Sequence, residues 1–433
     1  MSPREPGQFI TSMLSRVETG IVSIPSTRGE WSETLDQAER EGLGGLLLEA
    51  IDTRNIETPE YANRRLQLNA LSVASCNAQL LADLEPLVRS LNEADIPVML
   101  LKGAALNLTT YPTLGMRPMS DVDLLVRERD ALRACEVLRR AGCRDGIALM
   151  RHDFFPRFYY ETEFVFDGNG ALRIDLHARP FRPLRYARLI EEKEFWREVN
   201  AVKFGCASAL VPSAEVMLIH LAAHAAFHGC SRLIWLYDMM RWVDTHGRGV
   251  DWVRFFRLCE AWRLSLPVRE AITLAEARLE QFLPSASRKQ LSTQTSEWRD
   301  RLTLRQAPRD AGSPWLHVLT DLLCTPGVGF RLGYLLAYLN PGRDHLGAVY
   351  PYRHVGWTLA ASVYRAGRAG MRMASGLLRT CLKSQENRSL GVPLAACPPV
   401  FSRIRHGSQA TSGTPRDREN YALTNKRHSF APD

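Results

Sequence analysis

The chain has 433 residues, of which 45% are hydrophobic and 9% aromatic, a composition typical of a globular protein with room for two or three domains. Its formal net charge of +8 favours an anionic partner, such as a nucleoside triphosphate, a nucleic acid or an acidic membrane surface, without choosing among them. The nine cysteines form no C-x-x-C pair, which argues against a disulfide-rich secreted domain. Since the sequence also shows neither a signal-peptide core nor a long apolar run, we expect a cytoplasmic protein without a transmembrane segment.

The first part of the chain is predicted to be helical after a flexible start. Residues 1–30 are rich in Gly, Pro, Ser and Thr, and we expect them to be loosely held apart from a short helix near 9–17. Residues 31–95 carry apolar side chains at three- and four-residue spacing, which indicates an N-terminal helical segment. We expect the leucines at this spacing to be core contacts: Leu66, Leu68, Leu71, Leu80, Leu81, Leu84 and Leu87.

Residues 96–211 are predicted to alternate between strands and short helices. The segment begins with a buried strand at 96–101, a glycine turn at Lys102-Gly103 and a short helix at 104–110. Further on we predict an acidic strand around 121–126, a helix over 129–141, a strand over 154–166, a D-G-N-G hairpin turn over 167–170 and a return strand over 172–177.

Three carboxylates of this segment are the candidate catalytic and metal-binding residues. Because strand side chains alternate in direction, Asp121 and Asp123 leave one face of their strand, and Asp175 and His177 leave one face of the return strand. Carboxylates held side by side repel each other unless a cation neutralises them, and Mg²⁺ takes oxygen ligands while leaving places for substrate phosphates. We therefore predict a phosphate-handling site with Mg²⁺, or Mn²⁺ in its place, although Asp175 could instead pair with Arg173 or Arg179.

The residues around the acids are candidates for nucleotide binding. Gly103 would let a phosphate approach the backbone, and the helix that starts at Ala104 offers N–H donors. Lys102 either holds a phosphate oxygen or is an ordinary lysine at a strand end. Arg117 and Ser120 either contact the substrate or position the loop that leads to the acids.

After residue 212 the pattern is that of a helical domain reaching to 382. We predict four helices at 213–228, 231–246, 251–264 and 267–282, a polar, mobile connection at 285–314 and further helix at 316–339. A basic amphipathic helix at 354–382 could lie on an anionic membrane as a peripheral contact, although packing against the protein is the favoured interpretation. Residues 383–433 are predicted to be a disordered tail.

A histidine ladder stands on the first of these helices. His220, His224 and His228 follow one another at four-residue spacing on one helix face. Zinc would need further ligands from elsewhere, and such ladders more often serve packing and hydrogen bonding. An intermediate interpretation is that His220 and His224, together with His177, face the site and contact the nucleotide or the acceptor.

The chain also resembles a known family. The sequences K-G-A-A-L at 102–106, Y-P at 111–112, R-P-M-S-D-V-D-L-L-V at 117–126 and I-D-L-H at 174–177 resemble the uncharacterised nucleotidyltransferase family of the polymerase-beta-like superfamily. The resemblance extends over roughly residues 35–370. It implies an α+β fold in which residues 96–211 form a polymerase-beta-like nucleotidyltransferase core, a small mixed sheet with flanking helices, between N-terminal helices and a C-terminal helical domain.

The activity that this resemblance implies is the transfer of a nucleoside monophosphate from an NTP, ATP being one candidate, to a hydroxyl acceptor. Asp121 and Asp123 would bind the metals, and Asp175 would bind the activating metal and could receive the proton of the acceptor. One departure from the superfamily is Gly103-Ala104, where Gly-Ser or Gly-Gly is usual, so the nucleotide selectivity stays open.

Two other functions are compatible with the residues. A metal-dependent glycosyltransferase also binds a nucleotide through D-x-D, although the helical first 95 residues argue against it. A catalytically degenerate member could serve as a binding partner in a biosynthetic or toxin–antitoxin system, although such members usually lose acids that this chain keeps. The acceptor remains open among a small molecule, a glycan or lipid precursor, a peptide, a protein side chain and an RNA end, as do the preferred NTP and the oligomeric state.

Overall fold

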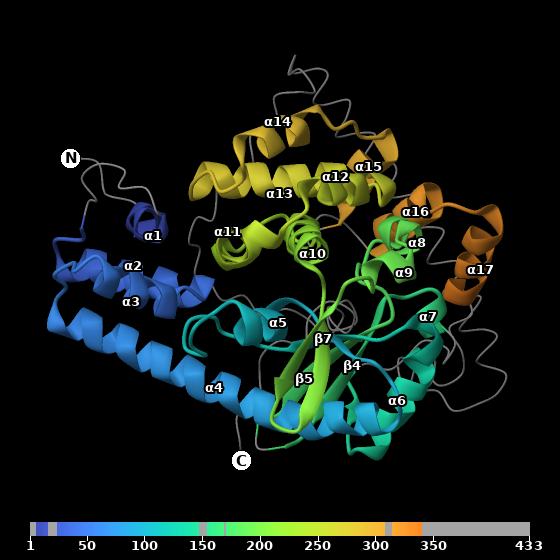
Figure 1. Ribbon diagram of the computed structural model, residues 1–433, viewed down its shortest axis with the longest axis horizontal. Helices are drawn as coiled ribbons and strands as arrows, with labels where there is room; N and C mark the ends of the chain where they lie inside the picture. Colours follow the sequence, from blue (N-terminus) through green and yellow to red (C-terminus); the bar gives the residue numbers. More distant parts are fainter. Residues whose placement is uncertain (1–5, 16–23, 147–153, 169, 308–313, 340–433) are drawn as a thin grey trace, which may run out of the picture. The chain divides into compact units, whose positions relative to one another are not determined.

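The computed structural model describes residues 6–15, 24–146, 154–168, 170–307 and 314–339 (Figure 1). All of them belong to one compact unit, Met1–Leu378. The amphipathic helix predicted at 354–382 and the tail predicted at 383–433 lie outside the described residues.

A mixed sheet forms the centre of the fold. In the described ranges it has seven strands in the order β3-β4-β5-β2-β1-β7-β6. The pairs β2–β5 and β1–β7 are parallel, and the other neighbouring pairs are antiparallel. This confirms the predicted α+β class with a mixed sheet and flanking helices. The strands are β1 (Met99–Leu100), β2 (Val122–Leu125), β3 (Arg144–Asp145), β4 (Glu161–Phe166), β5 (Leu172–His177), β6 (Asn200–Phe204) and β7 (Ala207–Val211).

One face of this sheet is apolar and covered by helices. Val122, Leu124 and Ile174 leave β2 and β5 on this face and are fully buried. The C-terminal half of α4 (Glu60–Glu93) packs against β5 and β7, and α6 (Ala131–Arg140) packs against α4. The alternation of apolar and acidic residues along β2 therefore separates a packed face from a face that carries the carboxylates.

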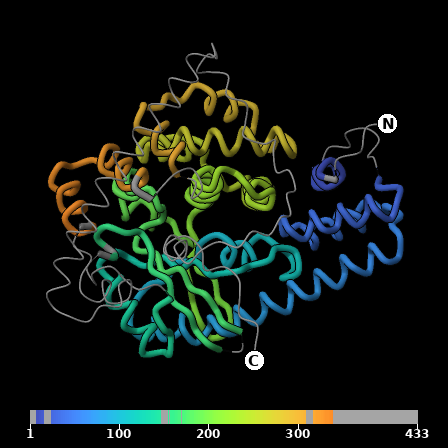
Figure 2. Tube along the Cα trace, turned by 180° about the vertical axis from the view of Figure 1, so that it is seen from behind, coloured from blue at the N-terminus to red at the C-terminus, as the bar shows by residue number. Residues whose placement is uncertain are grey.

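The N-terminal half of α4 contacts α2 (Arg28–Glu41) and α3 (Gly44–Thr53), as Figure 2 shows from behind. Two of the leucines expected in the core are instead exposed: Leu68 by 58% and Leu71 by 66% of their surface. The reason is the length of α4, 34 residues, which packs on α2 and α3 at one end and on the sheet at the other. Leu68 and Leu71 stand on a side that neither neighbour covers.

The start of the chain is more ordered than its composition suggests. Helix α1 (Pro6–Leu14) buries Phe9, Ile10, Met13 and Leu14, and the ring of Phe9 meets that of Trp31 edge to face at 5.5 Å. In α2 a capping box between Thr27 and Glu30 satisfies the first N–H groups. The short helix predicted near residues 9–17 is therefore present as α1, which begins three residues earlier because four apolar side chains of this short stretch share one core-facing side.

The short helices of residues 96–211 lie between the strands. The strand predicted over 154–166 is wrong in its first part, where α7 precedes β4. Helix α7 (Phe154–Arg157) is itself interrupted at Phe155, whose backbone angles of φ −91° and ψ 133° are non-helical, and Phe155 and Phe158 are both buried. The hairpin β6–β7 was not predicted, because most of β6 is exposed and lacks alternation. The short helices between the strands of residues 96–211 are α5 (Lys102–Thr109), η1 (Glu128–Asp130), α7 (Phe154–Arg157), α8 (Leu184–Leu189) and α9 (Glu192–Phe195).

The four predicted helices after residue 212 are present, within a few residues of the expected bounds, as α10 to α13. The mobile connection predicted at 285–314 is wrong, because α14 and α15 occupy most of it. Both are mostly polar helices that bury one leucine each, Leu291 and Leu304, and that form ion pairs, Arg288 with Glu276 at 2.8 Å and Arg185 with Asp300 at 2.8 Å. They therefore lack the continuous apolar stripe that would indicate a helix.

The remaining bounds are α10 (Ala214–Phe227), α11 (Leu233–His246), η2 (Gly247–Gly249), α12 (Trp252–Ala261), α13 (Ser265–Arg278), α14 (Ser285–Thr293), α15 (Trp298–Gln306), α16 (Pro314–Cys324) and α17 (Val328–Leu339). Across the described ranges, none of the helices combines the length and the apolarity that crossing a bilayer requires.

Candidate functional site

Three strands bring acidic side chains to the face of the sheet opposite α4. Asp123 of β2 is the register partner of Asp175 on the parallel neighbour β5, and Asp175 is in turn the partner of Glu163 on β4. Register partners on neighbouring strands project from the same face. Asp121 lies two positions before Asp123, and the period of two places it on this face as well.

Asp123 lies at the centre of a buried hydrogen-bonded group. Its Oδ1 accepts from the ammonium of Lys102 at 2.5 Å and lies 2.9 Å from Nε2 of His177. Burial alone would raise the pKa of Asp123, but the charge of Lys102 and the hydrogen bond from His177 outweigh it and hold this pKa well below its usual value. The same contact raises the pKa of Lys102 against the effect of burial. Asp123 is therefore ionised at neutral pH.

Asp175 has the opposite electrostatic character. Burial is the main cause that raises its pKa, to about 7, and the charges of Glu161 and Asp123 add to it. The two arginines considered as partners lie elsewhere: Arg173 pairs with Glu163 at 3.2 Å and Arg179 with Glu128 at 2.5 Å. Two neighbouring carboxylates with pKa values displaced in opposite directions are a pattern typical of catalytic sites.

His177 connects β5 to the other two strands. Its Nε2 lies 3.6 Å from Oε2 of Glu161, the residue opposite it on β4, and its ring packs 5.6 Å from that of Tyr160. Burial lowers the pKa of His177, but the hydrogen bond to Asp123 and the charge of Glu161 outweigh this and raise it. Glu161 and Glu163 were missed in the sequence, although they alternate along β4 opposite His177 and Asp175.

The glycine turn is shaped by an arginine. Lys102 has a backbone φ of 46°, in the left-handed region that is costly for a residue with a side chain. At the next position a Cβ would stand 2.6 Å from Nη1 of Arg117, so only glycine fits at 103 without a shift. The structure thus gives Gly103 a role in accommodating Arg117, whereas phosphate binding by Gly103 and the buried Ala104 stays a prediction.

Arg117 is buried and engaged within the protein. Its Nε and Nη2 donate to the carboxylate of Asp238 on α11, and Tyr111 donates to the same carboxylate at 2.6 Å. From α4, Asn77 donates to the backbone oxygens of Leu114 and Arg117 and accepts from Met119 N–H at 3.0 Å. These contacts fix the loop that leads to Asp121. Sequence reasoning missed Asn77, which stands in an otherwise unremarkable helical stretch.

Ser120 and Asp121 lie at the open end of this loop. The hydroxyl of Ser120 donates to Oδ1 of Asp121 at 3.2 Å in an exposed setting. Asp121 is partly buried, and its charge contributes to raising the pKa values of Asp175 and Lys102. The structure therefore brings Asp121 into electrostatic contact with the other acids while leaving its carboxylate accessible.

The histidine ladder on α10 packs beside the site. His220 is fully buried, stacks on Phe181 at 5.1 Å, and neither of its ring nitrogens has a hydrogen-bond partner within the described residues. Burial, together with the charge of Lys102, lowers the pKa of His220 to about 3. His224 lies between His228 and Trp235, with ring centroids 4.5 and 5.2 Å away, and burial lowers its pKa too. Both histidines are therefore neutral at physiological pH.

The sequence of the chain matches a known protein family. The sequence pattern of a family described as uncharacterised nucleotidyltransferase matches residues 27–280, more than half of the chain. The chain belongs to this family. No curated protein matches it.

The match covers β1 to β7 and α10 to α13, and with them the acids, Lys102, Arg117 and the histidine ladder. It starts before the range expected from the sequence motifs and ends at residue 280, well short of the expected 370. Membership indicates nucleotide transfer from a nucleotide donor.

The acidic residues of this site offer oxygen ligands, the kind that a hard divalent cation prefers. The acids supply carboxylate oxygens, and the raised pKa of Asp175 reflects a local excess of negative charge that a cation would relieve. In the described part of the chain, however, no three His, Cys, Asp or Glu side chains are arranged to enclose a metal ion. Mg²⁺ commonly binds through one or two carboxylates with substrate phosphates completing its shell, so a complete protein cage is not required.

Proposed function

We propose that the chain is a Mg²⁺-dependent nucleotidyltransferase that transfers a nucleoside monophosphate from an NTP to a hydroxyl-bearing acceptor. The observation that carries this proposal is the register pairing of Asp123 with Asp175 on adjacent parallel strands, beside Asp121 and above an apolar, helix-covered face. The same arrangement supports a polymerase-beta-like core for residues 96–211.

Asp121, Asp123 and Asp175 are the residues that would hold the metal, Mg²⁺ or Mn²⁺. When bound there, the metal would neutralise the charge of the triphosphate and of the pyrophosphate that leaves. Asp123 is suited to this task because Lys102 and His177 keep it ionised and fix its orientation.

Lys102 has a second role in this proposal. Its ammonium is the positive charge nearest to Asp123, and its left-handed backbone conformation holds it at the start of α5. A flexible, compact ammonium can turn from the carboxylate to a phosphate oxygen as the nucleotide arrives. Gly103, Ala104 and Ser120 would border the phosphates at this end of the site, while Arg117 acts as a positioning residue.

Asp175 is the proposed proton acceptor. Without a bound metal, the pKa of Asp175 is raised to about 7, so its carboxylate takes a proton more readily than an ordinary aspartate, and a bound cation would lower this pKa. The proton of the acceptor hydroxyl would pass to an oxygen of Asp175 as the hydroxyl oxygen attacks the phosphorus. His177, His220 and His224 would border the nucleotide or the acceptor from β5 and α10.

A thermal-shift screen tests the proposal without knowledge of the acceptor. The protein is melted with ATP, GTP, CTP or UTP, with and without Mg²⁺, and a ligand at 100 times its Kd should stabilise it by about 2.7 kcal/mol. We expect one NTP to raise the Tm only with Mg²⁺, and Asp123→Asn and Asp175→Asn to lose this shift.

The matched control is Asp167→Asn, an exposed acid of the same sheet region paired with Arg144 at 2.8 Å. It should keep the shift. A nucleotide sugar that stabilises the protein while every NTP fails would favour the glycosyltransferase. An absence of any shift, with folded protein, would contradict the proposal and favour the degenerate binding partner.

A further inference from the structure

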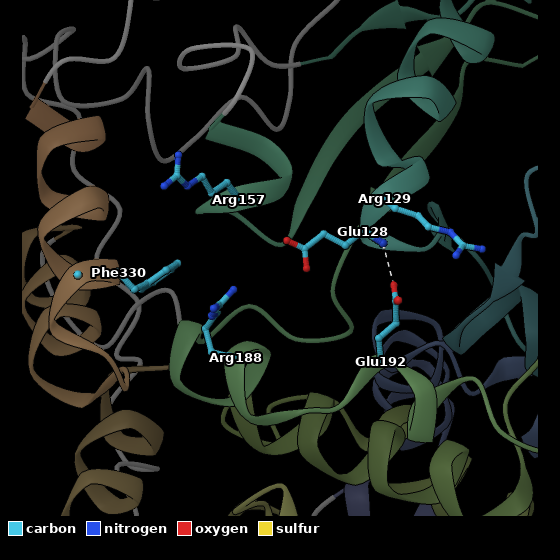
Figure 3. Close-up of a pocket in the computed structure, with 7 residues that line it drawn as sticks. Glu128, Arg129, Arg157, Arg188, Glu192 and Phe330 are labelled. Carbon is cyan, nitrogen blue, oxygen red and sulfur yellow. Dashed lines mark hydrogen bonds between the residues drawn. The ribbon is translucent and has the colours of Figure 1, made fainter.

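A cavity lies apart from the carboxylate site. Its volume is about 820 Å³, and among the described residues it is bordered by η1, α7, α8 and α17, with Glu128, Arg157, Arg188 and Phe330 facing it (Figure 3). Neither Lys102 nor any of the three proposed catalytic acids is among its lining residues. The volume falls in the range of pockets that bind small molecules, about 300–1,000 Å³.

Most charged groups at this cavity are already neutralised by a partner. Glu128 pairs with Arg179 at 2.5 Å, and Glu192 lies 3.9 Å from Nη1 of Arg127 and also accepts a hydrogen bond from the backbone N–H of Glu128 at 2.8 Å. Arg129 pairs with Asp130 at 3.6 Å, and Figure 3 shows its guanidinium pointing away from the cavity. Arg129 therefore lines the cavity with the aliphatic part of its side chain, whereas its charge lies outside.

Arg157 and Arg188 differ from these groups. Within the residues that the structure describes, neither has a carboxylate at ion-pair distance, and in Figure 3 Arg188 extends into the space that Arg157 and Phe330 border. Two guanidinium groups on one cavity repel each other unless an anion lies between them or water screens them. Arg157 and Arg188 are both exposed, and the two carboxylates that line the cavity among the described residues, Glu128 and Glu192, lie at ion-pair distance from Arg179 and Arg127 instead.

Aromatic rings hold these two arginines in place. The Cζ of Arg157 lies 5.0 Å from the ring centroid of Phe158, and the Cζ of Arg188 lies 4.7 Å from that of Phe330. The two rings are themselves 5.4 Å apart, and Phe158 is buried in a small apolar cluster with Leu184. A guanidinium packed against an aromatic ring keeps its N–H groups free for a ligand while it loses conformational freedom.

We infer that this cavity binds an organic phosphate, with the phosphoryl group held by Arg157 and Arg188 and an apolar portion of the ligand against Phe330. Arginine pairs bind phosphate through several parallel N–H···O bonds, which are stronger than neutral hydrogen bonds. Phe330 is only partly buried, so part of its side chain remains available to a ligand. This site does not depend on the proposed nucleotidyl transfer.

Isothermal titration of the full-length protein with phenyl phosphate tests the inference. We expect saturable binding at one site, and a Kd about tenfold higher in Arg157→Gln and in Arg188→Gln, since each loses a charge-assisted contact. Arg129→Gln is the matched control, because it removes an arginine of the same cavity whose charge points away; its Kd should stay within about twofold of the wild-type value. Circular dichroism melts establish that each variant is folded.

Further titrations identify what the cavity recognises. Phenol and benzoate should bind more weakly than phenyl phosphate, and Phe330→Leu should weaken phenyl phosphate binding while leaving inorganic phosphate unchanged. Asp123→Asn should bind phenyl phosphate like the wild type, which separates this site from the proposed catalytic one.

Three results would overturn the inference. One is the absence of saturable binding in the folded wild type, and another is a Kd for benzoate equal to that for phenyl phosphate. The third is an equal weakening by Arg129→Gln and Arg188→Gln, which would show attraction by the overall positive surface rather than by a built site.

Discussion

The guanidinium of Arg117 and the carboxylate of Asp238 form a buried ion pair between residues that are 121 positions apart in the chain. Three N–H···O contacts of 2.9–3.2 Å join them, and the Tyr111 hydroxyl donates to the same carboxylate. The pair fastens the loop before Asp121 to α11. It thereby connects the sheet that carries the acids to the helices that follow it.

Removing the charge of Asp238 should destabilise the protein strongly. In Asp238→Asn the guanidinium of Arg117 stays buried without its counter-charge, and breaking such a pair costs about 3–5 kcal/mol. Urea unfolding at pH 7 measures this loss of free energy of unfolding. The double variant Arg117→Met/Asp238→Leu should lose less, since no buried charge is left unpaired. A single variant within about 1 kcal/mol of the wild type would contradict the account.

Gly103→Ala should disturb the same contact from the other side. The added methyl would stand 2.6 Å from Nη1 of Arg117, whose guanidinium Asp238 holds in place, so we expect a loss of about 1–3 kcal/mol in the free energy of unfolding. Gly249→Ala is the control, because nothing lies within 4 Å of a Cβ there. Equal stability of the two variants would mean that Arg117 does not constrain Gly103.

Asp175 should make the metal-free protein less stable as the pH rises. Its pKa in the folded protein is about 7, above the ordinary 3.8, so the folded state binds this proton more tightly than the unfolded state. Stability is then lost progressively from about pH 4 to above pH 7, by about 1.4 kcal/mol for each unit of the shift. In EDTA, the free energy of unfolding of Asp175→Asn, measured with urea, should therefore rise relative to that of the wild type between pH 5 and pH 8.

Asp167→Asn provides a comparison of opposite sign. The hydrogen bond from Arg144 lowers the pKa of the exposed Asp167, so the ionised carboxylate of Asp167 stabilises the folded state. Asp167→Asn should therefore not become more stable than the wild type at high pH. If Asp175→Asn showed the same stability difference from the wild type at pH 5 and pH 8, burial and neighbouring charge would not perturb Asp175.

The core of the site could be predicted from the sequence because its signals are local. Apolar and acidic residues alternate around Asp121, Asp123 and Asp175, and a hairpin turn precedes β5. The two-residue period of a strand is then enough to place the three acids on one face of the sheet. The class of fold follows from the same periodicities. The strand that begins at Glu161 was recognised too, but its own two acids were not counted.

Other features depend on contacts that no local pattern shows. The pairing of Arg117 with Asp238 joins a loop to a distant helix, and Asn77 reaches the same loop from α4. Likewise, α14 and α15 bury only one leucine each and are otherwise polar and ion-paired, so the sequence of their segment resembles a loop. Tertiary packing, not propensity, decides such elements.

The carboxylate site is tested most sharply by the binding of Mn²⁺ together with a non-hydrolysable NTP analogue, followed by electron paramagnetic resonance. We expect the wild type to bind the Mn²⁺–nucleotide complex and Asp123→Asn and Asp175→Asn, both folded, to lose this binding, while Asp167→Asn retains it. Undiminished Mn²⁺–nucleotide binding in Asp123→Asn and Asp175→Asn would contradict the assignment of this carboxylate face as the nucleotidyl-transfer site.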